Sequence, residues 1–208
     1  IIRVTKILDC TFRDGGYYTN WCFDDHLVQT YLECCARAGV DLIEIGFLFP
    51  DSHDVGSFGR VDSSLVDKIR WSGSVDLGFM INAADYADAR GVEILAESIS
   101  ALRLTDKFRF ARIAVDSKSY DKAIALSKVL QPFGFDVFIN LMRIASLHEA
   151  EIKNISLELD REPDISGVYF ADSFGSMDPA VACQIFEWLG SGYSGQIGFH
   201  GHDNKGLA

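Results

Sequence analysis

The sequence predicts an α/β fold with a parallel sheet, because short strand-like runs alternate with longer segments of helical periodicity. The apolar runs recur at a spacing of roughly 30 residues, the length of one strand–helix unit. An apolar run of about five to eight residues, bounded by turn residues, is typical of a buried strand. Seven strands are expected, at Val4–Asp9, Leu42–Phe47, Asp76–Ile81, Phe108–Val115, Asp136–Leu141, Gly167–Ala171 and Gln196–His200.

Apolar stripes at helical spacing predict the first connecting helices. One helix begins after Asp24 and ends at Gly39, and its stripe is Leu27, Val28, Tyr31, Leu32 and Cys35. A short helix is expected around Leu65 and Ile69. A further stripe precedes Pro132 and Gly134 and consists of Ala123, Leu126 and Leu130.

Start signals predict two more helices. Ser146 and Glu149 have the spacing of a capping box, ahead of an apolar stripe of Ile152, Ile155 and Leu159. Asp178 followed by Pro179 is typical of a helix start. The buried face of this last helix is expected to be Val181, Ile185, Trp188 and Leu189, with Gly190 at its end.

Seven parallel strands fit two architectures. A doubly wound open sheet accommodates them, and so does a (β/α)₈ TIM barrel that is incomplete here, with about seven strands and six helices. A complete barrel has eight strands and about 250 residues. In the barrel the last helix–strand–helix segment is missing, and residues 1–208 are one catalytic domain, the N-terminal part of a longer protein.

Composition narrows the range of partners. The net charge of −11 argues against nucleic acid and anionic membranes, which need a cationic surface. No apolar run approaches the roughly 20 residues of a membrane helix. Five cysteines without a paired framework are typical of reduced thiols. The expected location is cytoplasmic.

The first chemically distinctive segment, Asp9–Tyr17, reads DCTFRDGGY and directly follows the first predicted strand. In a barrel, the segment after a strand lies on the catalytic face. Glycines allow the backbone to turn sharply beside a ligand. An alternative interpretation is a structural turn in which Arg13 pairs with Asp9 or Asp14.

The second segment, Gly198–Asn204, reads GFHGHDN and ends the seventh predicted strand. Side chains two residues apart on a strand point to the same side, so His200 and His202 should face the same way. With a carboxylate from another strand end they would offer two nitrogens and one oxygen. Such a set suits Mn²⁺, Fe²⁺, Co²⁺ or Zn²⁺, and Mg²⁺ less well. The two segments together favour a metal centre, and with it the barrel.

These two segments resemble the signatures of the DRE-TIM metallolyases, a family that contains 4-hydroxy-2-oxovalerate aldolase, 3-hydroxy-3-methylglutaryl-CoA lyase and the isopropylmalate and homocitrate synthases. The resemblance spans the chain, since Gly39–Phe47 and Phe170–Met177 also look like strand ends of the family. The opening segment and the Ala171–Ser173 segment look closest to 4-hydroxy-2-oxovalerate aldolase-like catalytic domains.

The resemblance implies a role for each matching residue. Asp14, His200 and His202 would bind a divalent metal, with Mn²⁺ expected and Mg²⁺, Co²⁺ or Zn²⁺ as alternatives. Arg13 would be catalytic and would bind the enolate or ketone oxygen. Ser173 would hold the substrate carboxylate, and Glu44 would support the site from the end of the second strand. At the end of the fifth strand, Asn140 is a further candidate for substrate contact.

The sequence departs from the family pattern at one functional position. The aldolases closest in chemistry carry a histidine shortly after the Arg-Asp-Gly segment, as the general base for the 4-hydroxyl proton. Here Gly16–Asn20 reads GYYTN, and the next histidine is His26. Tyr17 is a candidate acid or base in its place, and it is also a candidate packing residue on the barrel rim.

The expected activity is a metal-dependent aldolase that cleaves a 4-hydroxy-2-oxo acid to pyruvate and an aldehyde. An acyl-CoA-dependent Claisen condensing synthase or an HMG-CoA lyase-type enzyme is the alternative. Such synthases usually carry His-x-His-Asn-Asp, whereas the order here is Asp203-Asn204. A barrel that binds a metal and a small acid without turnover is a third interpretation. The expected partner is a small oxo-acid substrate, and a homo-oligomer or a partner dehydrogenase is left open.

Overall fold

The computed structural model describes residues 5–51, 54–71, 73–202 and 206. Seven strands lie in this part of the chain. They are β1 (Leu8–Asp9), β2 (Leu42–Phe47), β3 (Asp76–Asn82), β4 (Phe110–Asp116), β5 (Asp136–Met142), β6 (Gly167–Ala171) and β7 (Gln196–His200).

Helices separate the strands along the chain. The α-helices are α1 (Thr11–Asp14), α2 (Asp25–Ala38), α3 (Ser63–Lys68), α4 (Ala89–Ala101), α5 (Tyr120–Leu130), α6 (Glu149–Asp160) and α7 (Pro179–Gly190). Short 3₁₀ turns are η1 (Gly15–Tyr18), η2 (Ala83–Tyr86), η3 (Leu104–Asp106), η4 (Ser117–Ser119), η5 (Gln131–Phe133) and η6 (Ile144–Ser146).

The strand order decides between the two predicted architectures. The strands follow one another in sheet order from β1 to β7. Neighbours pair in parallel, as in Phe138 with Gly167 and Gly167 with Gln196. A doubly wound sheet reverses its strand order at a switch point, whereas barrel strands keep the order of the chain. The fold is therefore the incomplete (β/α)₈ barrel, with seven strands in the described residues.

The predicted strands agree closely with the structure. The second, sixth and seventh have the predicted bounds, and the others shift by one or two residues. The first is an exception, because β1 covers only Leu8–Asp9 of the expected Val4–Asp9, and Val4 lies outside the described residues. Among the described residues, β1 pairs with β2 alone. A strand with one neighbour has half of the ladder hydrogen bonds that would extend it.

Capping side chains fix the helix starts. Asp24 caps α2 through the backbone N–H groups of His26 and Leu27, and Gly39, with φ of 81°, ends it as predicted. Asp178 accepts from Val181 N at the start of α7. The predicted cap of α6 was wrong: the helix begins after His148, whose N–H donates to Glu151, while Ser146 lies in η6. Ser146 instead donates its hydroxyl to the carbonyl of Arg143.

The sequence analysis did not predict helix α4, although the capping residue Asp88 marks its start. The carboxylate of Asp88 accepts from Gly91 N over 2.7 Å, and Leu95 and Ile99 are buried. Gly91 also allows close packing, since a Cβ there would lie 2.8 Å from the Cα of Tyr86.

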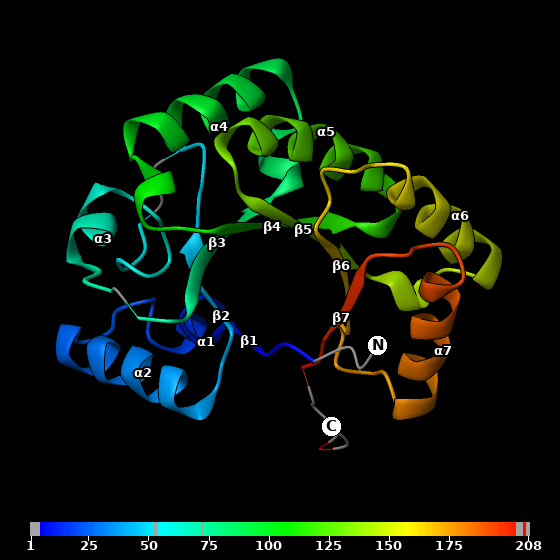
Figure 1. Cartoon of the computed structure of the whole chain (residues 1–208), viewed down its shortest axis with the longest axis horizontal. Helices are drawn as coiled ribbons and strands as arrows, with labels where there is room; N and C mark the ends of the chain where they lie inside the picture. Colours follow the sequence, from blue (N-terminus) through cyan, green and yellow to red (C-terminus); the bar gives the residue numbers. More distant parts are fainter. Residues whose placement is uncertain (1–4, 52–53, 72, 203–205, 207–208) are drawn as a thin grey trace. The chain divides into compact units, whose positions relative to one another are not determined.

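The chain forms two compact units. The N-terminal unit comprises residues 1–111 and 133–135. In it α2 and α3 lie on one side of β1–β3 (Figure 1). Its core is made of strand and helix residues that are almost completely buried: Leu32, Ile43, Ile45, Leu65, Leu77 and Phe79.

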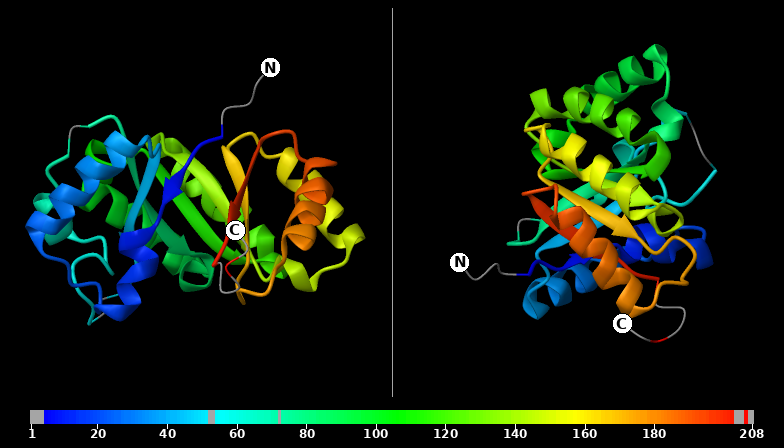
Figure 2. Two further views of the ribbon diagram at one scale, coloured as in Figure 1. Left: turned by 90° about the horizontal axis from the view of Figure 1, so that it is seen from below. Right: turned by 90° about the vertical axis from the view of Figure 1, so that its right-hand side faces the viewer.

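The C-terminal unit comprises residues 112–132 and 136–208. Helices α6 and α7 pack against each other and lie along the same side of β6 and β7 (Figure 2). Its core residues are also almost completely buried: Ile113, Val137, Ile139, Ile152, Leu159, Val168, Ile185 and Leu189. This packing leaves the ends of the strands to carry polar side chains.

Candidate active site

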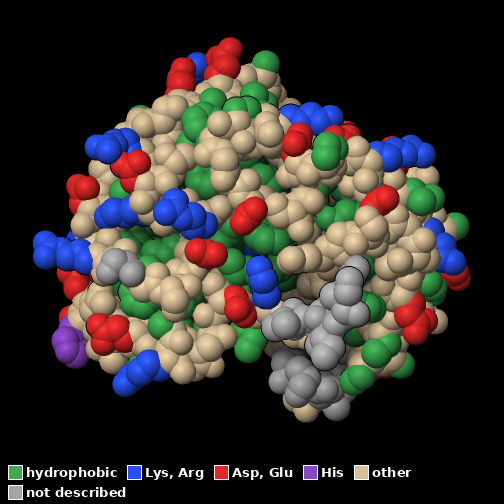
Figure 3. All heavy atoms as spheres, viewed as in Figure 1, with side chains coloured by type: hydrophobic (Ala, Val, Ile, Leu, Met, Phe, Trp, Pro, Cys, Tyr) green, Lys and Arg blue, Asp and Glu red, His purple; other side chains and the backbone are tan. Residues whose placement is uncertain are grey.

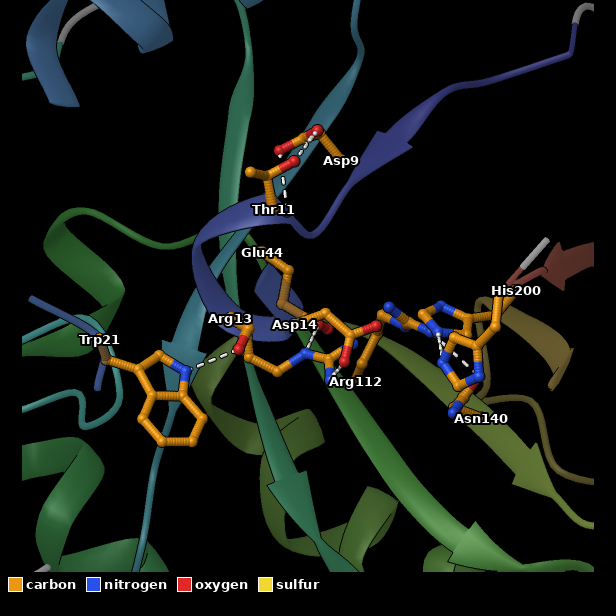
Figure 4. Close-up of polar contacts among 10 residues, drawn as sticks. Asp9, Thr11, Arg13, Asp14, Trp21, Glu44, Arg112, Asn140 and His200 are labelled. Atoms are coloured by element: carbon orange, nitrogen blue, oxygen red, sulfur yellow. Dashed lines mark hydrogen bonds and ion pairs between the residues drawn. The ribbon is translucent and has the colours of Figure 1, made fainter. Parts of the chain in front are cut away.

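The segment after β1 brings Arg13, Asp14 and Glu44 together in the N-terminal unit (Figure 4). Arg13 Nε donates to Glu44 Oε1 over 2.5 Å, and Nη1 donates to Asp14 Oδ1 over 3.0 Å. The guanidinium carbon also lies 5.3 Å from the centre of the Phe47 ring. Glu44 is completely buried and Arg13 nearly so. Burial lowers the pKa of Arg13, but attraction to Glu44 and Asp14 outweighs burial and raises that pKa, so the guanidinium stays charged.

The ion pair expected in the alternative turn interpretation is confirmed for Asp14. Arg13 does pair with Asp14, whereas Asp9 accepts hydrogen bonds from Thr11 and from the hydroxyl of Tyr31, each over 2.9 Å. The additional pairing with Glu44 on β2 ties the segment to the neighbouring strand. Arg13 is thus held at both ends of its guanidinium by carboxylates.

Trp21 stabilises the segment that carries Arg13 through a hydrogen bond to its backbone. Its indole Nε1 donates to the carbonyl of Arg13 over 2.6 Å. Its ring occupies the space beside Gly16, where a Cβ would lie 2.0 Å from Trp21 Cδ1, which explains that glycine. The carbonyl of Trp21 in turn accepts from Phe58 N over 3.2 Å, so the loop after β2 holds the turn. Asn20 and Trp21 both have positive φ, of 49° and 55°.

Tyr17 is largely exposed and packs beside Trp21. Its side chain is 63% exposed, and its ring centre lies 4.5 Å from that of Trp21. Among the described residues its hydroxyl has no hydrogen-bond partner. Tyr17 therefore packs on a neighbouring ring, as one of the two expectations for it stated. Its role as an acid or base stays a prediction.

The two histidines converge in the C-terminal unit. His200 ends β7, and its Nε2 lies 3.2 Å from Nε2 of His202. Two nitrogen ligands about 2.0–2.1 Å from one ion lie about 2.9–3.4 Å apart at bond angles of about 90–109°. The pair therefore has the spacing of two ligands of a single metal. Asp203 and Asn204 lie outside the described residues.

Asn140 on β5 belongs to a buried polar layer of the same unit. Arg112 on β4 donates from Nη2 to Asn140 Oδ1 over 3.0 Å (Figure 4). The guanidinium carbon of Arg112 lies 4.5 Å from the centre of the Tyr169 ring on β6. Sequence analysis missed Arg112, although a lone arginine inside an apolar strand is a signal, because an unpaired buried charge is costly.

Ser173 follows β6 on a rigid loop. The carboxylate of Asp172 accepts from Ser176 N over 2.8 Å and from Met177 N over 3.2 Å, which fixes the turn. Ser173 Oγ accepts from Arg143 N over 2.9 Å. The Arg143 side chain forms an ion pair with Asp116 at the end of β4. The ends of β4, β5 and β6 are thus linked beside Ser173.

Charge at the surface is mixed. Acidic and basic side chains are interspersed over the face shown in Figure 3. None of the helices in the described residues has the length and apolarity needed to cross a membrane.

A family model described as HMGL-like matches residues 4–208. The chain belongs to the HMGL-like family. The predicted membership of the DRE-TIM metallolyases is thereby confirmed, and the family is one of metal-dependent lyases and aldolases.

Curated relatives of this HMGL-like chain are lyases of 2-oxo acids by name. It is 26% identical over 215 residues to oxaloacetate decarboxylase of Mycobacterium tuberculosis, and 26% identical over 212 residues to 4-hydroxy-2-oxovalerate aldolase of a Roseiflexus species. Each match covers 99% of this chain and 59% of the relative. The chain thus spans about three fifths of the curated relatives' length.

Solved structures share the fold. The N-terminal domain of a candidate aldolase from Bacteroides vulgatus matches with a TM-score of 0.82 and 30% identity, covering 98% of this chain and 66% of the other. HMG-CoA lyase of Bacillus subtilis matches with a TM-score of 0.73 and 18% identity, covering 98% of this chain and 70% of the other. At that identity the second likeness concerns the fold alone.

Proposed function

We propose that this HMGL-like chain is the catalytic barrel of a divalent-metal-dependent carbon–carbon lyase, which cleaves a 4-hydroxy-2-oxo acid to pyruvate and an aldehyde. The observation that carries the proposal is the 3.2 Å spacing of the His200 and His202 nitrogens at the end of β7. The two nitrogens are within hydrogen-bond distance of each other, and the same spacing is compatible with two ligands of one ion.

His200, His202 and Asp14 are the proposed metal ligands, with Mn²⁺ as the expected ion. Two imidazoles and a carboxylate suit Mn²⁺, Co²⁺ or Zn²⁺ better than Mg²⁺. A bound ion would supply Lewis-acid polarisation of the 2-oxo group. Glu44 does not need to bind the ion, because its carboxylate is paired with Arg13.

Arg13 is the proposed oxyanion partner. When the C3–C4 bond breaks, its electron pair stays on the pyruvate fragment, which forms an enolate. C4 becomes the aldehyde carbon, and the proton of the C4 hydroxyl passes to a base. A permanently charged guanidinium donates stronger hydrogen bonds as the enolate charge grows. The pairing of Arg13 with Glu44 and Asp14 pre-orients the group and removes the cost of ordering it.

Ser173 and Asn140 are the proposed substrate-binding residues, and Glu44 supports them by holding Arg13. Ser173 uses one lone pair to accept from Arg143 N, so its hydroxyl proton remains available for a carboxylate. Tyr17 is the proposed base for the hydroxyl proton. A cytoplasmic location, a homo-oligomer and a dehydrogenase that takes up the aldehyde belong to the same proposal.

The position of Tyr17 favours a second candidate, the decarboxylation of oxaloacetate. That reaction breaks the bond between C3 and the distal carboxylate, forms the same enolate and releases CO₂, so no hydroxyl proton has to be removed. The segment after Arg13 lacks a histidine, and the Tyr17 side chain is largely exposed beside Trp21. Both features agree with a site that needs no base there.

The test is a comparison of the two substrates with full-length protein. Protein stripped of metal and reloaded with Mn²⁺ should release pyruvate and an aldehyde from 4-hydroxy-2-oxovalerate. Pyruvate from oxaloacetate alone would select the second candidate. The variants His200→Ala and His202→Ala should be inactive with both, while His26→Ala on the exposed start of α2 serves as the matched control. Metal-independent turnover would contradict the proposal.

A further inference from the structure

The polar layer formed by Arg112, Asn140 and Tyr169 lies on the same side of the sheet as His200. Asn140 pairs in register with Tyr169, and Tyr169 pairs with Gly198. A Cβ on Gly198 would lie 2.4 Å from Tyr169 Cε1, so the Tyr169 ring covers the side of β7 to which residue 198 points. His200 is two residues further along β7 and points to that same side. The layer therefore lies one same-side position before His200 along the strands.

The direction of the Asn140 amide follows from its partner. A guanidinium offers hydrogen-bond donors and no acceptor, so only the oxygen of the amide can face it. The structure agrees, because Arg112 Nη2 lies 3.0 Å from Oδ1. The amide nitrogen with its two N–H donors must then point elsewhere.

These donors lie in a nearly closed environment. Asn140 is 5% exposed, and among the described residues no hydrogen bond from Nδ2 is present. Nδ2 is not one of the fully buried atoms without a partner in the described residues, so its N–H groups face space that a ligand can reach. Two N–H donors suit an acceptor-only group, such as a carboxylate or an enolate oxygen.

We propose that Arg112 is a positioning residue that locks the Asn140 amide with its N–H donors toward the substrate, and thereby selects an oxyanion of a 2-oxo acid. The inference rests on the proposed function and adds a residue and a recognition rule to it. Arg112 itself is completely buried, so it acts through Asn140 and not by touching the substrate. The Tyr169 ring, whose centre lies 4.5 Å from the guanidinium carbon, packs against Arg112 and helps to hold it in place.

The first test replaces Asn140 with aspartate in the full-length, Mn²⁺-loaded protein. Asn140→Asp has the same shape and gains an ion pair with Arg112, but it loses both donors. Binding of oxalate, measured by calorimetry, should weaken at least 10-fold, with metal content and melting temperature retained. Asn154→Asp, on the exposed face of α6, makes the same charge change and should leave oxalate binding within about 2-fold.

The second test separates orientation from packing at Arg112. Lysine offers donors only, as arginine does, whereas glutamine can accept from the Asn140 N–H groups and let the amide turn. Arg112→Lys should bind oxalate within about 3-fold of the wild type, and Arg112→Gln at least 10-fold more weakly. In turnover, Asn140→Asp should raise KM about 10-fold and change kcat little, because a carboxylate contact is the same in ground and transition states.

The outcomes are distinguishable. If the wild type binds Mn²⁺ and oxalate, and Asn140→Asp binds oxalate equally well, the proposed role of the amide is overturned while the proposed function stands. Equal loss in Arg112→Lys and Arg112→Gln shows a purely structural arginine and also overturns that role. A wild-type protein that binds neither metal nor oxalate overturns the proposed function, and this inference with it. If the Arg112 variants do not fold, the Asn140→Asp result decides.

Discussion

The guanidinium of Arg13 and the carboxylate of Glu44 form a buried ion pair, with Nε 2.5 Å from Oε1. Arg13 lies in α1, shortly after β1, and Glu44 lies within β2, where its side chain has no exposed surface. Breaking a buried pair is costly because the remaining charge loses its partner. The pair therefore has two consequences that can be measured separately, one for stability and one for catalysis.

Replacing Arg13 tests both consequences. Arg13→Ala should lower kcat by about 10²–10³, the loss seen when one oxyanion donor is removed, and leave metal content unchanged. It should also lower the free energy of unfolding by about 3–5 kcal/mol, because Glu44 is left unpaired. The double variant Arg13→Leu, Glu44→Leu should recover stability without recovering turnover. Wild-type turnover in Arg13→Ala at full metal content would exclude Arg13 from the reaction.

Trp21→Phe tests the brace behind Arg13. The change keeps an aromatic ring beside Gly16 but removes the indole N–H that donates to the carbonyl of Arg13. We expect a loss of about 1–3 kcal/mol in unfolding free energy, since that carbonyl loses its donor. Urea unfolding measures it, with Trp188→Phe on α7 as the control. Equal stability of the two variants would show that the brace has no energetic role.

Tyr17→Phe distinguishes the two candidate reactions. If the hydroxyl of Tyr17 takes the substrate proton, aldol cleavage should fall by about 10²–10⁴. Oxaloacetate decarboxylation should be unchanged, because it has no such proton to remove. Tyr18→Phe, whose side chain is 95% exposed, is the matched control. Aldol cleavage that survives in Tyr17→Phe would assign the base to another group.

Asp62 at the start of α3 predicts a pH-dependent contribution to stability. Burial raises the pKa of Asp62, but hydrogen bonds from Leu65 N and the Arg60 side chain outweigh burial and lower that pKa. The unfolded chain therefore binds the proton more tightly than the folded one. The stabilisation is complete above the unfolded pKa of about 3.9 and disappears as the pH falls through the lower folded pKa.

Asp62→Asn isolates this charge, because asparagine keeps the capping oxygen. The variant should be less stable than the wild type by up to about 1 kcal/mol at pH 7, given that the Arg60 pair is partly exposed. The difference should shrink as the pH falls below the unfolded pKa of about 3.9 and disappear once Asp62 is protonated in the folded protein too. Unfolding curves at several pH values measure it, and a difference independent of pH would contradict the account.

Local signals predicted most of the fold. Asp24, Asp178 and Gly39 occupied the cap positions expected of them, because capping depends on a few adjacent residues. The choice between barrel and open sheet depended on strand order, which no single segment contains. Ser146 does not cap α6 because it lies in the 3₁₀ turn η6, where its hydroxyl donates to the carbonyl of Arg143.

The candidate site was predictable where residues of distinctive chemistry stood close together in the sequence. His200 ends β7 and His202 lies two positions further along the chain, so the nearness of their rings was expected from the sequence spacing. The hydrogen-bond partners of Arg13 and Asn140 could not be predicted from the sequence in this way. Glu44 is 31 residues from Arg13, and Arg112 is 28 residues from Asn140. Trp21 acts on Arg13 through a backbone carbonyl, and no sequence pattern encodes such a contact.

The most direct test of the metal centre is anomalous diffraction at the manganese absorption edge from crystals of the full-length protein grown with Mn²⁺. The account predicts one peak about 2.0–2.3 Å from a carboxylate oxygen of Asp14 and from Nε2 of both His200 and His202. A peak elsewhere, or an ion that either histidine or Asp14 does not reach, would contradict it.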